Sequence, residues 1–508
     1  MLIRSLKALS AAVYSSALFF YATAISIFAA LEKIHQYEAV IGLEVHAQLR
    51  TQSKLFCGDS TAFGAQPNTQ VSPVSLAHPG TLPVMNKAVT ELAVKLGLAL
   101  QCTMVRHNYF ARKNYFYPDL PKAYQVSQHT APICRGGFLT LSNHKKVLLN
   151  RIHIEEDAGK SIHDLDEHFT YLDFNRAGIP LLEIVTEPCI HSAADAYDYL
   201  TQLRRLVRWL GVCNGNMEEG SMRCDANISI RLKGETKLGT RVEVKNLNSI
   251  RHVKLAIDFE INRLIELTEN GKQIVQQTRS FDAEKGTTFS LRTKEDAEDY
   301  RYFPEPDLPP IFLSEAYLQS IQSALPVLPE ALFQKYTGQF QLAPNIAQTL
   351  CADKEDADFF EHLLQHTSSI KAAANWVVGP VKSYCNEHQV DLSNFPLSFS
   401  TLADLISLVE SGKLSFGNAS GRVFQTLINQ PGRMPEEVAI ALNLMQEKDE
   451  AATEAWVNEV MNKMPEKVKE YQSGKKGLMG LFAGEVKKLS KGKADMAVVN
   501  KILLEKLN

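Results

Sequence analysis

The sequence predicts an α+β protein in which a largely antiparallel sheet with one polar face is followed by all-α helical and tail domains. Three observations support this prediction. Segments that alternate apolar and polar residues recur up to about residue 250, helices interrupt them irregularly, and helical periodicity dominates from about Ser314 onwards. A period of two sends successive side chains to opposite faces of a strand. Strands with one polar face are typical of an antiparallel sheet with one solvated side.

Composition sets the class of protein. The 508 residues are 45% hydrophobic and 22% charged, with a net charge of −3. This balance excludes a polycation that binds nucleic acid through a high net positive charge. Any contact with nucleic acid must therefore come from local patches of basic residues. The eight cysteines include no Cys-x-x-Cys pair. They predict a reducing compartment, the cytoplasm, without a disulfide framework or a thiolate zinc site.

Residues 1–36 do not fit the soluble pattern. Arg4 and Lys7 precede an uncharged, mostly apolar stretch from Ala8 to Leu31. A signal sequence, a membrane anchor, an organelle transit peptide and a translation start nearer Tyr37 all fit these residues. We expect a non-catalytic extension, with organelle or membrane association through it left open. For the mature domain no membrane partner is expected.

The first predicted strand lies within residues 39–49, with Glu44, His46 and Gln48 on one face. An amphipathic helix is predicted near residues 86–100. The segment 112–122 then mixes bases, aromatic residues and prolines without a period. Either it is a well-packed Ω-like loop, or its bases, Arg112 and Lys113 among them, contact phosphates and nucleobases.

The strand at residues 151–156 is the centre of the prediction. Alternation places Arg151, His153 and Glu155 on one face, and it places Glu156 with two isoleucines on the other. An unpaired carboxylate on an apolar face is costly. Three consecutive acids at a strand end therefore suggest a bound Mg²⁺, although an exposed acidic strand end explains them equally well.

Later strands repeat the polar face. Glu183 lies in a strand within residues 173–188, Arg223 and Asp225 lie in one within 218–231, and Glu243 and Lys245 lie in one within 240–246. Helices are predicted over 192–211, with Ser192 as N-cap, and over 249–270. Five strands with interleaved acids and bases fit a site better than a plain surface. Clustered carboxylates hold hard cations, and Arg or Lys beside them holds phosphate.

Beyond Pro310 the pattern becomes helical, and the final segment, 460–508, holds eleven lysines against five acids. A lysine-rich helix face is most often simply solvated, but it also suits a salt-sensitive contact with a phosphate backbone. The predicted domains are a catalytic α+β domain at 37–312, a helical domain at 313–432 and a lysine-rich tail domain at 433–508.

Seven motifs in this order resemble the B subunits of the aspartyl/glutamyl-tRNA amidotransferases. They are Ile41-Gly-Leu-Glu-Val-His46, Arg112-Lys-Asn-Tyr-Phe-Tyr-Pro-Asp119, His153-Ile-Glu-Glu-Asp-Ala-Gly-Lys160, Met217-Glu-Glu-Gly-Ser221, Arg223-Cys-Asp-Ala-Asn227, Lys245-Asn-Leu-Asn-Ser249 and Asp299-Tyr-Arg-Tyr-Phe-Pro-Glu-Pro-Asp307. The resemblance covers about residues 37–508 and is densest up to Pro310.

The resemblance implies a catalytic domain of glutamine-synthetase-like topology, a tRNA-binding tail and an ATP-dependent reaction. ATP would phosphorylate the side-chain carboxylate of Glu on tRNA(Gln), or of Asp on tRNA(Asn), and ammonia would displace the phosphate. A separate amidase subunit would supply that ammonia through a channel, and a small third subunit would brace the heterotrimer. Which of the two tRNAs is used stays open.

By the same resemblance, a set of acids and one histidine would form the Mg²⁺ and phosphoryl-transfer cluster, namely Glu44, His46, Glu156, Glu183 and Glu243. Glu155 and Asp225 would be their neighbours. Basic residues would bind the phosphates of ATP, with Arg112, Lys113, Lys160, Arg223 and Lys245 as candidates. A cation must bridge the mutually repelling γ-phosphate and carboxylate. Because Mg²⁺ keeps several waters, some of these residues would act through water.

One feature of some relatives is not expected here. They carry a four-cysteine zinc site after the first strand, where this sequence has Cys57, Asp59, Ser72 and Ser75. One thiolate cannot hold zinc tetrahedrally, so we expect no zinc.

Two other functions compete with the amidotransferase. A free-standing carboxylate–ammonia ligase that acts on a small molecule would use the same acidic sheet, but it would need neither tRNA nor a lysine-rich tail. A non-catalytic tRNA-binding or assembly protein would not need the carboxylates. ATP hydrolysis with and without aminoacyl-tRNA separates the three.

Overall fold

The computed structural model describes residues 36–163, 165–293, 300–446, 450–490 and 492–507. They form two compact units, the first ending at Leu328 and the second beginning at Pro329. The apolar stretch between Ala8 and Leu31 lies outside the described residues. Among the residues that are described, no helix has both the length and the apolar character needed to cross a membrane.

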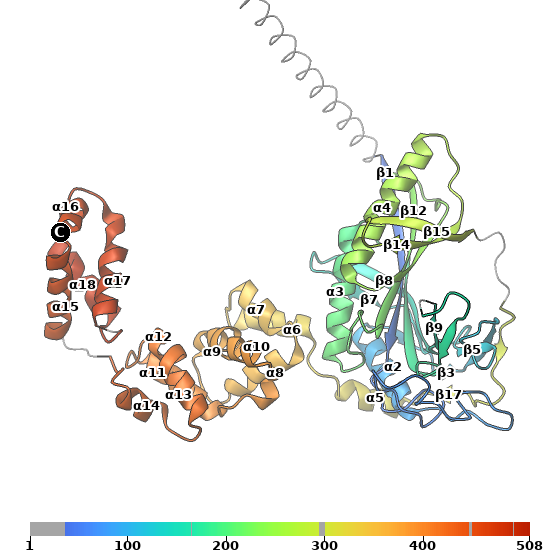
Figure 1. Ribbon diagram of the computed structural model, residues 1–508, viewed down its shortest axis with the longest axis horizontal. Coiled ribbons are helices and arrows are strands. Elements are labelled where there is room, and N and C mark those ends of the chain that lie inside the picture. The colour runs from blue at the N-terminus through green and yellow to red at the C-terminus, as the bar shows by residue number, and fades with distance from the viewer. Residues whose placement is uncertain (1–35, 164, 294–299, 447–449, 491, 508) are drawn as a thin grey trace, which may run out of the picture. The chain divides into compact units, whose positions relative to one another are not determined.

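The first unit is built on one large sheet around strand β1 (Tyr37–Gln48) (Figure 1). Along the sheet the order is β15-β14-β13-β12-β1-β11-β8-β5-β4-β16. The other strands in this order are β15 (Thr287–Thr293), β14 (Gln277–Asp282), β13 (Val242–Leu247), β12 (Met222–Leu232), β11 (Pro180–Thr186), β8 (Lys146–Glu156), β5 (Tyr124–Ser127), β4 (Ala111–Asn114) and β16 (Phe303–Pro304). Neighbouring strands run antiparallel except β13 and β14, which are parallel. The predicted largely antiparallel sheet is confirmed.

Short strands complete the β structure. In the large sheet, β6 (Cys134–Arg135) and β7 (Phe138–Thr140) pair with β8, and β2 (Thr103–Met104) pairs with β6. Separately, β9 (Lys160–Ile162) pairs with β10 (Tyr171–Asp173), and β3 (His107–Asn108) pairs with β17 (Ile311–Phe312).

Helices pack against the apolar face of the sheet. They are α2 (Lys87–Ala99), α3 (Ala193–Trp209) and α4 (Ile250–Glu269), and α5 (Glu315–Ser323) packs on α2. Asn86, Ser192 and Ser249 cap the first three through their side-chain oxygens, because an N-cap oxygen satisfies an amide that the first helical turn leaves free. These helices confirm the predictions for residues 86–100, 192–211 and 249–270.

The core lies between these helices and one face of the sheet. Leu43 and Val45 of β1 are fully buried there, together with Leu203 of α3 and Ile257 of α4. Residues at the alternate positions of β1 point to the opposite face of the sheet, where Glu44 and His46 are only partly buried. The fold thus leaves a polar sheet face accessible to ligands.

The first unit extends past the predicted boundary at residue 312. Leu318 and Ile321 of α5 belong to its core, and the indole nitrogen of Trp209 donates to the carbonyl of Val327 at 3.0 Å. The helical periodicity that begins near Ser314 therefore starts within the first unit, because an amphipathic helix is indistinguishable by pattern from the helices of the next domain.

The second unit is helical. Its first part contains α6 (Pro329–Gln334), α7 (Pro344–Leu350), α8 (Lys354–Leu363), α9 (Ile370–Trp376), α10 (Lys382–His388), α11 (Phe399–Glu410), α12 (Phe416–Asn418), α13 (Phe424–Asn429) and α14 (Pro435–Ala441). The tail helices are α15 (Glu450–Lys463), α16 (Pro465–Gln472), α17 (Met479–Leu489) and α18 (Met496–Leu507). These four share a core of their own around Val457, Phe482 and Leu503.

Candidate functional site

Strand register aligns the polar residues of β1 with those of its neighbours. His46 pairs with Glu183 of β11 on one side and with Arg223 of β12 on the other, and Glu183 pairs in turn with His153 of β8. Directly opposed residues in a sheet have Cβ atoms about 5 Å apart. Register therefore turns residues that are distant in sequence into one continuous row across four strands.

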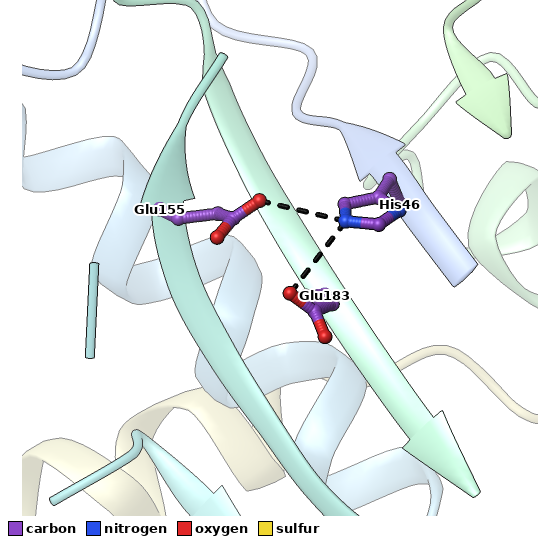
Figure 2. A group of neighbouring side chains, drawn as sticks. All are labelled: His46, Glu155 and Glu183. Atoms are coloured by element: carbon purple, nitrogen blue, oxygen red, sulfur yellow. Dashed lines mark ion pairs between the residues drawn. The ribbon is translucent and has the colours of Figure 1, made fainter. Parts of the chain in front are cut away.

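The first group of potential metal ligands consists of His46, Glu155 and Glu183, which offer ligand atoms within 4.8 Å of one another. Figure 2 shows their side chains converging from three neighbouring strands. The Nε2 atom of His46 lies 3.6 Å from Glu155 Oε1 and 3.5 Å from Glu183 Oε2. His153 supports the same two acids, with its Nε2 atom 3.1 Å from Glu183 and 3.6 Å from Glu155.

The charges of this group are strongly coupled. Burial alone would lower the pKa of His46, but the hydrogen bond and charge of Glu183 raise it to about 9. The pKa of His153 is also raised to about 9, because the charges of Glu183 and Glu155 outweigh its burial. Burial would raise the pKa of Glu183, yet His153 and His46 hold it well below the ordinary value. Two imidazolium groups thus balance the acids when no metal ion is bound.

The second group consists of Glu44, Asp225 and Glu243, whose carboxylates also approach within 4.8 Å. Glu44 pairs with Asp225 in the sheet register. The Nζ atom of Lys245 lies 3.2 Å from Asp225 and 3.0 Å from Glu243. This group is the part of the site nearest the β13 side of the sheet.

Two polar residues hold the acids of the second group. The Nδ2 atom of Asn227 donates to Glu44 at 2.9 Å, and the hydroxyl of Thr278 donates to Glu243 at 3.1 Å. Burial raises the pKa of Glu44, and the charges of Glu183, Asp225 and Glu243 add to the effect. A carboxylate with a raised pKa is one that a cation would stabilise in its charged form.

The first group, together with Glu44 and Asp225 of the second, lines one groove on the polar face. Other polar residues of this groove include Arg151, Arg223 and Lys113. The donor set suits a hard divalent cation, since it consists mainly of carboxylate oxygens. In addition, the Oδ1 atom of Asn227 is buried and receives no hydrogen bond from the described residues. Such an oxygen can complete the shell of a cation directly or through a water molecule.

Glu156 does not join either group, so the structure places it apart from the other predicted metal ligands. Its carboxylate forms an ion pair with Lys122 and accepts a hydrogen bond from the amide of Val126 at 2.8 Å. The side chain faces a second, more enclosed cavity. The reason is the alternation of β8, which separates Glu156 from His153 and Glu155. Glu155, which we expected only as a neighbour, is the acid that faces the groove.

The predicted basic residues divide in the same way. Lys113, Arg223 and Lys245 line the groove. Arg112, next to Lys113 on β4, instead pairs with Glu305 through two hydrogen bonds of 2.8 and 2.7 Å. Lys160 is exposed on β9 and does not line the groove. The structure therefore does not place Arg112 or Lys160 with the expected phosphate-binding residues.

Sequence reasoning missed two groove residues that hold others in place. His153 was assigned to the correct face. Its spacing of two residues from Glu155, which puts both side chains on one face, was the signal that could have included it. Asp157 follows the strand and accepts hydrogen bonds from Arg223 at 2.9 Å and from Gln48 at 3.1 Å. No local pattern predicts this role, because the partners come from distant strands.

The four positions compared with a zinc site lie together in the loop after β1. Asp59 accepts hydrogen bonds from the hydroxyl of Ser75 and from the amide of Ser72, and Cys57 lies 3.3 Å from the Ser75 hydroxyl. Hydrogen bonds connect this part of the loop.

Comparison with known proteins adds independent information. A family model described as the GatB/GatE catalytic domain matches residues 39–319, and one described as the GatB domain matches residues 358–507.

Curated relatives match nearly the whole chain, and those cited here are all named as the B subunit of an aspartyl/glutamyl-tRNA(Asn/Gln) amidotransferase. The protein from Thermodesulfovibrio yellowstonii is 45% identical over 473 residues, which cover 92% of this chain and 99% of the relative. The one from Geotalea uraniireducens is 47% identical over 484 residues, with 93% and 100% covered. The one from Geobacter sulfurreducens is 47% identical over 477 residues, with 93% and 99% covered.

Proposed function

Because this chain belongs to the family of aspartyl/glutamyl-tRNA amidotransferase B subunits, we propose that it catalyses the ATP-dependent amidation of misacylated tRNA. Its substrate is Glu on tRNA(Gln), Asp on tRNA(Asn), or both. ATP phosphorylates the side-chain carboxylate, and ammonia then displaces the phosphate to give the amide. This assigns the chain to the glutamine-hydrolysing carbon–nitrogen ligases.

The observation that carries the proposal is the convergence of two carboxylate groups on one groove. Glu155 and Glu183 with His46 form one group, and the acids around Glu44 form the other. Mg²⁺, when bound, would screen the repulsion between the γ-phosphate and the carboxylate that attacks it. Glu156 is not part of this proposal.

The chain's own residues orient the reactants. Arg223 and Lys113 line the groove and provide positive charge for the phosphates, while Asp157 fixes the Arg223 guanidinium. His153 holds the carboxylates of Glu183 and Glu155. Electrostatic positioning of this kind supplies most of the catalysis in phosphoryl transfer.

We further propose that a partner amidase supplies the ammonia from the side of the enclosed cavity. The cavity lies on the Glu156 side of β8, and Asp157 lines both this cavity and the groove. Ammonia released by the amidase subunit would reach the acyl phosphate from this side, with a small third subunit in the same heterotrimer. We also propose a glutamine-synthetase-like topology for the sheet domain, and tRNA binding by the lysine-rich tail.

The test uses the complex reconstituted with its amidase partners. We expect Glu-tRNA(Gln) or Asp-tRNA(Asn) to stimulate ATP hydrolysis and to be converted to the amide. Glu183→Gln should lower both rates by at least about 100-fold, because it weakens the first metal group and removes a charge that balances two imidazolium ions. Glu266→Gln, an exposed position on α4, is the matched control and should keep full activity.

The competing functions give different results. Amidation of a free amino acid without tRNA would indicate a small-molecule ligase. Unchanged activity in Glu183→Gln would reject the catalytic groove and leave a binding or assembly role.

A further inference from the structure

Lys245 lies within the second acid group, and its position there is unusual. Its ammonium contacts Asp225 and Glu243, while Glu44, the third acid, is held by Asn227. Thr278 holds the other oxygen of Glu243. The acids are therefore fixed from outside the group, and Lys245 is the cation within it.

The second acid group carries more negative than positive charge. Within the group, three carboxylates face one ammonium, and a divalent cation would offset the excess negative charge. A divalent ion held by these three carboxylates would lie close to the Lys245 ammonium, since both would contact Asp225 and Glu243. Two cations cannot share the same carboxylates without strong repulsion.

The ammonium of Lys245 has room to move away from the second acid group into the groove. It is 35% exposed and lines the groove, so its flexible four-carbon stem has open space on the groove side. The acids around it cannot follow, because Asn227 and Thr278 hold two of them in place. Movement of the ammonium is therefore the simplest way to admit a second cation.

We propose that Lys245 is an exchangeable cation: it holds the second acid group together in the metal-free protein, moves out when a divalent cation binds, and then contacts a phosphate oxygen of the nucleotide. The last step rests on the proposed function, whereas the exchange itself does not. Metal binding would in this way prepare the groove for the nucleotide. Lysine suits this role better than arginine, because an arginine fork would hold two carboxylates too firmly to be displaced.

Mn²⁺ binding to the full chain in its complex, followed by electron paramagnetic resonance without nucleotide, tests the exchange. We expect Lys245→Met to bind Mn²⁺ about tenfold more tightly, because the competing ammonium is gone, and Lys245→Arg to bind it more weakly. Lys254→Met is the control, since it also removes one lysine–carboxylate pair, with Asp258, but on the outer helix α4. It should bind Mn²⁺ like the unaltered protein. Unchanged or weaker binding by a folded Lys245→Met variant would overturn the proposal.

A measurement on the unaltered protein covers the case in which the variant fails to fold. Mn²⁺ alone should increase acylation of Lys245 by an amine-directed reagent at least about threefold, as read by peptide mass spectrometry. A non-hydrolysable ATP analogue added with Mn²⁺ should then protect it. If Mn²⁺ leaves Lys245 labelling unchanged or lowers it, the exchange is wrong. If Mn²⁺ increases labelling but the analogue does not protect, the exchange stands and the nucleotide contact is refuted.

Discussion

The same substitution in two adjacent acids of β8 should have different effects on metal affinity. Glu155 faces the groove within the first metal group, whereas Glu156 faces the enclosed cavity and pairs with Lys122. Glu155→Gln removes a metal-ligand charge but little packing. Glu156→Gln removes one member of an ion pair and leaves the metal groups intact.

The size of the Glu156→Gln effect follows from its surroundings. The Glu156 side chain is only 6% exposed, whereas that of Lys122 is 20% exposed and can recruit water. Removing one partner of a fully buried pair costs about 3–5 kcal/mol. Because glutamine keeps an oxygen for the Val126 amide and Lys122 stays partly hydrated, we expect a smaller loss of about 1–3 kcal/mol in unfolding free energy.

Urea unfolding and Mn²⁺ titration of both variants provide the assay. Glu155→Gln should weaken Mn²⁺ binding by about 10–100-fold. Because the Glu155 side chain is only 5% exposed and lies beside His46 and His153, this variant should also lose stability, so metal affinity is the measurement that separates the two variants. Glu156→Gln should bind Mn²⁺ within about threefold of the unaltered protein while losing stability, a difference in binding free energy well under the roughly 1.4 kcal/mol that a tenfold change represents. The assignment of the two faces is refuted if Glu156→Gln loses metal affinity and Glu155→Gln does not.

Three further predictions address the supports, the core and the pH response. Asn227→Ala and Thr278→Val should each weaken Mn²⁺ binding by about 10–100-fold in a chain whose circular dichroism is unchanged, and full affinity in both would contradict their role as supports. Tyr199→Phe should leave the unfolding free energy unchanged or raise it by up to about 1 kcal/mol, because the buried Tyr199 hydroxyl has no hydrogen-bond partner among the described residues; a loss above about 1 kcal/mol would reveal a partner. The pKa values of His46 and His153 are raised from 6.5 to about 9, so their protonated forms should add to the unfolding free energy of the metal-free protein. This contribution should be complete below pH 6.5 and should disappear as the pH rises through 9. Urea unfolding in chelator at pH 6.5 and 9.5 measures it, and an equal pH response in His153→Gln would contradict the assignment.

Local patterns predicted most of the sheet domain. Alternation identified β1, β8, β12 and β13 together with the residues on each polar face, because a period of two is a direct consequence of strand geometry. The predicted N-cap Ser192 located the start of α3. These features depend on neighbours in sequence, which is why one sequence sufficed.

The alternation of apolar and polar residues did not predict the register between neighbouring strands. That His46 pairs with both Glu183 and Arg223 depends on how three strands slide past one another, and no local signal fixes this. The resemblance pointed to Glu156, while the alternation of the strand placed Glu155 on the same face as His153. The structure agrees with the alternation, so the strand's own geometry was the better guide to which acid faces the groove.

The domain boundary shows a different limit. Helix α5 has the same apolar periodicity as the helices that follow it, yet Leu318 and Ile321 pack into the core of the first unit. Apolar periodicity indicates that one face of a helix is buried, but it does not indicate which element covers that face. Tertiary contacts alone decide its domain.

The most direct test of the metal site is anomalous diffraction from crystals of the complex grown with Mn²⁺ and a non-hydrolysable ATP analogue. We predict Mn²⁺ peaks within bonding distance of Glu155 and Glu183 and of Glu44 and Asp225, with the terminal phosphate between them. A peak beside Glu156 in the enclosed cavity, with the groove acids bound to no ion, would contradict this prediction.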